Sequence, residues 1–202
     1  PTSPLNVGVQ MAAFASMGTY SATDLVIIDG GANDAADLVG AYLSIPRDSA
    51  ASYGALLGTL LTPTQIGTAL AGGSATVAAI GGTYMTALAD KFYTSIKASV
   101  LDKNAPYIVV MNMPGITNTP RFQMVLDGVA AATAAGAKAA GADAATAASA
   151  GAKARTDSET LFKSWIVAFN TELAAKVGAE PRVALIDFYT GINDEVANPA
   201  QY

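Results

Sequence analysis

Three short apolar runs divide the chain, and glycine or proline follows two of them closely. They cover residues 24–29, 107–113 and 182–188 and are rich in Val and Ile. Continuous β-branched runs of this length, without polar alternation, are typical of strands buried on both faces of a parallel sheet. The pattern therefore predicts three buried strands.

Between these runs, apolar residues recur every three to four positions, as they do along one face of a helix. The first helix is predicted to begin with Ser3 as its N-cap and Pro4 at its first position, and a second helix to cover residues 33–42. Residues 48–104 predict two or three amphipathic helices, with breaks at Pro63 and at the glycine pairs 72–73 and 81–82. Strands separated by helices indicate a parallel sheet with crossover helices.

The segment before the third strand is unusually rich in alanine. Sixteen of the 25 residues from 130 to 154 are Ala, interrupted by Gly136, Gly141 and Gly151. Alanine has the best helix propensity, so the segment predicts either a helical hairpin or one long helix. Because its side chains offer little apolar area, we expect residues 128–156 to form a peripheral, mobile helical excursion without chemistry of its own.

The amino-acid composition argues against three classes of protein: disordered chains, nucleic-acid binders and membrane-spanning proteins. The chain has 202 residues, is 51% hydrophobic and only 13% charged, and carries a net charge of -5. Such a chain forms a core, which excludes an acidic disordered protein, and its acidic balance argues against nucleic acid as a partner. The long uncharged stretch 49–89 contains Pro63 and two glycine pairs, so we expect no membrane span.

Two residue types that carry much enzyme chemistry are absent, since the chain contains neither cysteine nor histidine. This excludes disulfides, thiolate metal sites and a cysteine nucleophile. A complete Ser-His-Asp triad is likewise impossible within these residues. Catalysis by this chain alone would depend on carboxylates, Lys, Tyr or hydroxyls.

The candidate chemistry follows the first strand, where residues 30–34 read Gly-Gly-Ala-Asn-Asp. This position is the carboxyl edge of the sheet, where α/β folds build their sites. The amide of Asn33 there can donate hydrogen bonds to a developing negative charge. The alternative is that Asn33 or Asp34 simply caps the following helix.

Residues 31–34 resemble the Gly-x-Asn-Asp block of the SGNH or GDSL ester hydrolases, which are serine esterases and lipases. Residues 111–120 resemble the family's next strand and loop, and residues 187–202 resemble its last strand and the helix after it. The resemblance implies a flavodoxin-like three-layer α/β/α sandwich in which the strands here are the family's numbers 3, 4 and 5. It also implies an extracellular or periplasmic location and a single hydrolase-like domain over residues 1–202, incomplete at both ends. From the same resemblance we expect neither a metal nor an organic cofactor.

By this resemblance, Asn33 is the oxyanion-hole donor and Gly31 belongs to the backbone of the motif. Asn118 and Thr119, on a loop at the same sheet edge, are candidates to bind the ester substrate. The family's Gly-Asp-Ser block, its second block and its final Asp-x-x-His block are not found; residues 187–190 have Thr where His is needed. We therefore expect this chain alone to be inactive.

The missing chemistry implies partners for an active enzyme. These are the N- and C-terminal segments of the same enzyme or a second copy of the chain. The run at 25–28 lacks the charges, proline or bulge that protect natural edge strands, so we expect residues 25–29 to be paired on both sides. The alternative reading of the whole chain is a non-catalytic α/β binding or scaffold module.

Overall fold

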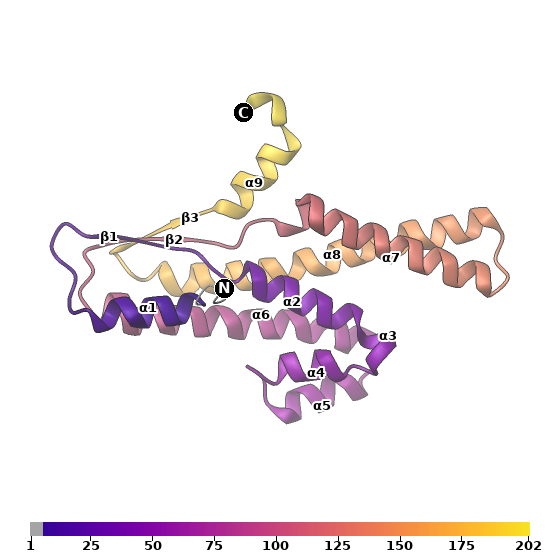
Figure 1. Ribbon diagram of the computed structural model, residues 1–202, viewed down its shortest axis with the longest axis horizontal. Coiled ribbons are helices and arrows are strands. Elements are labelled where there is room, and N and C mark those ends of the chain that lie inside the picture. The colour runs from indigo at the N-terminus through magenta and orange to yellow at the C-terminus, as the bar shows by residue number, and fades with distance from the viewer. Residues whose placement is uncertain (1–5) are drawn as a thin grey trace, which may run out of the picture.

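The computed structural model describes residues 6–202, of which 71% are helical (Figure 1). Three strands, Leu25–Ile28 (β1), Tyr107–Met111 (β2) and Val183–Ile186 (β3), form one parallel sheet in the order β1-β2-β3. The three strands thus occur where the apolar runs predicted them, although each is shorter than its run. Within the described residues, β1 is paired on one edge only, so the expectation of a partner on both sides is not met by this chain.

The flavodoxin-like three-layer sandwich is wrong. Helices lie against one face of the small sheet, and alternate residues on its other face, such as Leu25, Ile27 and Tyr107, are 58%, 63% and 60% exposed. On the covered face, Ile28 and Val110 are buried. The apolar runs place apolar side chains on both faces of the sheet. The helices of the described chain cover only one of these faces. The fold is therefore a helix-rich assembly with a small parallel sheet.

Three helices lie side by side beneath the sheet in Figure 1. They are Val7–Ser16 (α1), Ser74–Ile96 (α6), which continues into a π-helical turn at Lys97–Leu101 (η1), and Ala144–Val177 (α8). The Oδ1 atom of Asn6 caps α1 by accepting a hydrogen bond from the Val9 amide at 2.9 Å. The predicted cap at Ser3 and Pro4 lies outside the described residues.

Four shorter helices connect β1 to α6: Ala32–Leu43 (α2), Ile45–Asp48 (α3), Ala51–Leu57 (α4) and Pro63–Ala71 (α5). Pro63 separates α4 from α5 as predicted, but it does so by opening α5, where its missing N–H needs no partner. Thr62 and Gln65 form a capping box at this start, because each side chain accepts a hydrogen bond from the other residue's backbone N–H.

The glycine pair at 81–82 does not break α6, contrary to the sequence prediction. Gly81 lies against the indole of Trp165 in α8, so closely that a Cβ atom built at position 81 would be 2.3 Å from Trp165 Cε2. Trp165 is 2% exposed and donates from Nε1 to the carbonyl oxygen of Ala78 at 3.0 Å. Gly81 thus allows two helices to approach, and packing of the indole outweighs the low helix propensity of glycine.

Two arrangements were predicted for the alanine-rich segment, a helical hairpin and one long helix, and the structure has the hairpin. Pro120–Ala139 (α7) and α8 run antiparallel and project beyond the rest of the molecule in Figure 1. They approach closely at Gly151, where a Cβ atom would be 2.6 Å from the carbonyl oxygen of Ala130. Small side chains therefore pack the two helices against each other. The mobility of the hairpin stays a prediction.

The remaining elements are a 3-10 turn at Ile116–Asn118 (η2), the helix Phe188–Ala197 (α9) and a 3-10 turn at Pro199–Gln201 (η3). Over residues 6–202, none of the helices combines the length and the apolar character needed to cross a bilayer.

Candidate functional site

Asn33 lies at the carboxyl end of β1, as predicted from the sequence. The chain leaves β1 at Ile28, turns through the two glycines 30–31 and enters α2 at Ala32. Asn33 is the second residue of that helix and is exposed, and within residues 6–202 no hydrogen bond of its side chain is found. Its amide is therefore available to a ligand at this edge of the sheet.

Gly31, not Asn33 or Asp34, is the N-cap of α2, so the capping alternative is wrong. Gly31 has φ of 94°, in the left-handed region that glycine adopts without strain. A Cβ atom here would also be 2.8 Å from Met113 Cε and 3.1 Å from Phe169 Cζ. Both the backbone conformation and the lack of space thus require glycine at this point, which places Gly31 in the scaffold that positions Asn33.

A hollow of about 300 Å³ adjoins this turn. Gly30, Gly31 and Asp34 line it together with apolar residues of α6 and α8, and Lys91 is the cation in its wall. Desolvation raises the pKa of the Asp34 carboxyl above its ordinary value. The hollow therefore joins an apolar wall to one acidic and one basic group.

Asn118 and Thr119, predicted to line the substrate pocket, are occupied by structural contacts. The Nδ2 atom of Asn118 donates to Asn193 Oδ1 at 2.8 Å, which ties η2 to α9. Thr119 is the N-cap of α7, and its hydroxyl donates to the carbonyl oxygen of Ile116 at 2.7 Å. Asn118, Thr119 and Asn33 all lie outside the lining of the hollow beside Gly31 and of the groove along β1, so neither opening brings the three residues together.

Two polar links at the same sheet edge were not predicted. Asn112, which follows β2, donates from Nδ2 to Asp187 Oδ1 at 2.9 Å and accepts from the Tyr189 amide at 2.8 Å. In α8, Asn170 binds both the amide and the carbonyl of Met113, at 2.8 and 2.9 Å. The signal for Asn112 and Asp187 was their position directly after a strand, whereas nothing local to Asn170 indicated its partner.

The pKa of the Asp187 carboxyl is held below its ordinary value, first by hydrogen bonds from Thr190 and then by the one from Asn112. Asp187 comes directly after β3 and is the N-cap of α9, accepting from the Thr190 amide at 3.0 Å. Through these bonds the carboxylate caps the first turn of α9. Asn112 and Asp187 therefore hold the ends of β2 and β3 together, and Asn33 is the candidate whose side chain is unengaged.

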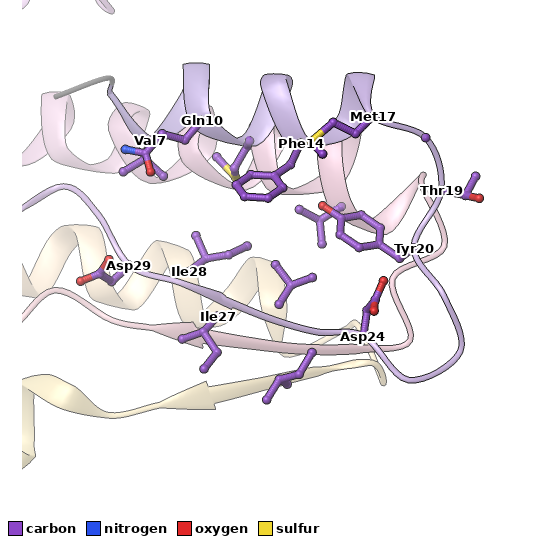
Figure 2. A pocket seen from close by; sticks show the side chains of 15 residues that line it. Val7, Gln10, Phe14, Met17, Thr19, Tyr20, Asp24, Ile27, Ile28 and Asp29 are labelled. Carbon is purple, nitrogen blue, oxygen red and sulfur yellow. The ribbon is translucent and has the colours of Figure 1, made fainter. Parts of the chain in front are cut away.

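A groove runs along β1, between this strand and α1 (Figure 2). It has a volume of about 590 Å³ and is lined mainly by apolar side chains of both elements. Phe14 of α1 and Met17, the C-cap of α1, line it on one side, while Asp24 and Asp29 lie at opposite ends of β1. The unpaired edge of the sheet thus opens into a groove next to the turn that carries Asn33.

Among residues 6–202, no group of three or more His, Cys, Asp or Glu side chains is arranged to hold a metal ion. No model of a known protein family, no curated protein and no solved structure matches the chain.

Proposed function

We propose that this chain is part of a serine hydrolase that acts on carboxylic esters and that Asn33 donates from Nδ2 to the oxyanion. The observation that carries the proposal is the exposed, unengaged amide of Asn33 at the carboxyl end of β1. The first turn of α2 adds the positive end of its helix dipole at the same place. An unengaged donor in the first turn of a helix favours a developing negative charge nearby.

The reaction assigns Asn33 to one step. A serine hydroxyl attacks the carbonyl carbon of the ester, a C–O bond forms, and the carbonyl electron pair moves onto oxygen. A base takes the serine proton, and the Asn33 amide stabilises the oxyanion. The oxyanion then collapses to a carbonyl, the bond between the carbonyl carbon and the alkoxy oxygen breaks, and the base gives the proton to the departing alcohol. Water then cleaves the acyl-enzyme in the same manner, releasing the carboxylic acid.

The base and the nucleophile come from outside this chain in the proposal. No histidine occurs among the 202 residues, so the usual proton carrier near neutral pH must be supplied by another segment or polypeptide. The open edge of β1 supports this division of labour, because a strand added there would end beside Asn33. Gly31 contributes by holding the turn in the conformation that exposes Asn33.

A co-expression experiment tests the proposal. The chain is produced with a polypeptide carrying a Gly-Asp-Ser segment and an Asp-x-x-His segment, and hydrolysis of p-nitrophenyl butyrate is measured for the mixture and for each component. The proposal expects turnover by the complex and none by this chain alone. Equal activity of the second polypeptide with and without this chain would contradict it.

The non-catalytic binding module is the competing function, and the groove along β1 is the observation that favours it. The two functions differ in one result of the same experiment. A complex that forms but hydrolyses no ester supports the binding module. A complex whose hydrolysis depends on Asn33 supports the hydrolase.

A further inference from the structure

The outer edge of β1 has the features of a site for strand addition. Only β2 pairs with β1 among the described residues, and its register runs without interruption from Leu25 to Ile28. Backbone groups alternate in direction along a strand, so every second residue of β1 turns its N–H and C=O away from β2 and toward the groove. An extended segment can pair with these groups by main-chain hydrogen bonds.

This edge lacks the devices that keep natural edge strands from pairing. The segment Leu25–Ile28 contains no proline, no lysine and no charge, and no bulge interrupts its pairing with β2. The groove along it has a volume of about 590 Å³, which would also suit a small molecule. The unpaired edge of β1 is the feature that fits a polypeptide strand in preference to a compact ligand.

The wall opposite β1 is apolar and incompletely covered. Phe14 and Met17, both from the α1 side, are 63% and 82% exposed, and both line the groove (Figure 2). Burying side chains of this size against a partner is favourable by about 25 cal/mol for each Å² of apolar surface. An incoming strand with apolar side chains on its α1-facing side would bury them.

Charge selects among possible strands. Asp24 and Asp29 lie at the two ends of the groove, and none of its lining residues is Lys or Arg. A second copy pairing antiparallel through its own β1 would set Asp24 of one chain near Asp29 of the other at both ends. Like charges in this arrangement disfavour self-pairing, whereas basic residues at the ends of a different strand would complement both carboxylates.

We infer that the groove between α1 and β1 binds an extended polypeptide segment that pairs with β1, has apolar residues facing α1 and carries basic residues at its ends. The segment belongs to a different sequence from this chain. The inference does not depend on ester hydrolysis, because a binding module would use the groove in the same way.

A labelled peptide tests the site on the full 202-residue chain. The probe is a nine-residue peptide of alternating Val and Thr with Lys at each end, and binding is followed by fluorescence anisotropy and by amide exchange of residues 25–28. We expect exchange there to slow by at least about tenfold, as for amides that gain hydrogen bonds. A matched peptide with Glu at both ends should bind at least about tenfold more weakly.

Two controls separate strand pairing from simple attraction of a basic peptide to an acidic protein. A peptide of the same charge with Pro at its centre cannot form the ladder and should lose protection of residues 25–28. Phe14→Arg should weaken binding by about fivefold or more, since it places a cation in the groove. Met124→Arg, at a residue on α7 that is 74% exposed and outside the groove, should leave binding unchanged.

Three results would overturn the inference. The first is unchanged exchange of residues 25–28 at saturating peptide. The second is equal binding of the Pro-containing peptide. The third is concentration-dependent self-association that protects residues 25–28 without peptide, which would assign the edge to a second copy.

Discussion

The side-chain amide of Asn112 donates to the carboxylate of Asp187 over 2.9 Å and so joins the carboxyl ends of β2 and β3. Asn112 is only 8% exposed, and its oxygen also accepts from the Tyr189 amide. One side chain thus fixes where β3 ends and α9 begins. Within residues 6–202, the remaining strand, β1, has no such link at its carboxyl end, and the side chain of Asn33 beyond it is unengaged.

Asn112→Ala should destabilise the fold. The substitution removes the acceptor of the Tyr189 amide and a donor to Asp187, and a part-buried polar group left unpaired costs about 1–3 kcal/mol of unfolding free energy. Urea denaturation measures the change. Asn198→Ala is the matched control, because that amide donates only to the exposed Asp194, and it should change stability by less than about 0.5 kcal/mol. Equal losses for the two variants would contradict the role given to Asn112.

The contribution of Asp187 should depend on pH. Its pKa is lowered in the folded state, so its stabilising effect is complete above the unfolded carboxyl pKa of roughly 3.9 and is lost as pH falls through the lower folded pKa. The difference in unfolding free energy between the parent chain and Asp187→Asn should therefore be largest near neutral pH and shrink in acid. A difference that stays constant from pH 7 to pH 3 would refute this assignment.

Gly81→Ala and Gly82→Ala should have opposite effects although the residues are neighbours in α6. A Cβ atom at position 81 would be 2.3 Å from the Trp165 indole, whereas at position 82 the nearest atom is 3.9 Å away. Overpacking at 81 should cost about 1–3 kcal/mol. At 82, higher helix propensity should gain about 0.5–1 kcal/mol. Thermal unfolding of both variants checks the pair, and stabilisation by Gly81→Ala would show that the two helices can move apart at no cost.

The alanine-rich part of the α7–α8 hairpin, residues 128–156, should be the first site of proteolysis. Residues 140–143 connect the two helices, and most of the alanine-rich flanks are exposed. Limited trypsin digestion should cut at Lys138 or Lys153 before any site beside the sheet, and amides of the hairpin should exchange faster than those of β2. Protection of the hairpin equal to that of Val109 and Val110 would show that it is held as firmly as the core.

The sequence predicted the strands well and their surroundings poorly. Runs such as residues 25–28 are apolar throughout, which indicates a strand but cannot tell whether a second layer of helices covers its outer face. The exposure of Ile27 therefore required the structure. Gly81 was read as a helix break for a similar reason, since its partner Trp165 is 84 residues away in the sequence and no local pattern announces the contact.

The candidate site was predicted in part. Asn33 lies at the carboxyl end of β1 because a glycine turn after a parallel strand leads to that edge whatever covers the sheet. Its neighbours were harder to predict. Asn118 and Thr119 lie at the same edge, but Asn118 hydrogen-bonds to α9 and Thr119 caps the start of α7. Whether a polar side chain is hydrogen-bonded depends on contacts between segments that are far apart in the sequence. Local sequence patterns do not predict these contacts.

The effect of Asn33→Ala on the turnover number of the complemented enzyme tests the central claim most directly. If the Asn33 amide binds the oxyanion, its loss should lower kcat for p-nitrophenyl butyrate by about 100- to 1000-fold while the urea midpoint stays unchanged. Asn198→Ala, at a distant amide, should retain full activity. A loss in kcat smaller than about threefold for Asn33→Ala, with the complex intact, would remove Asn33 from the reaction and contradict the account.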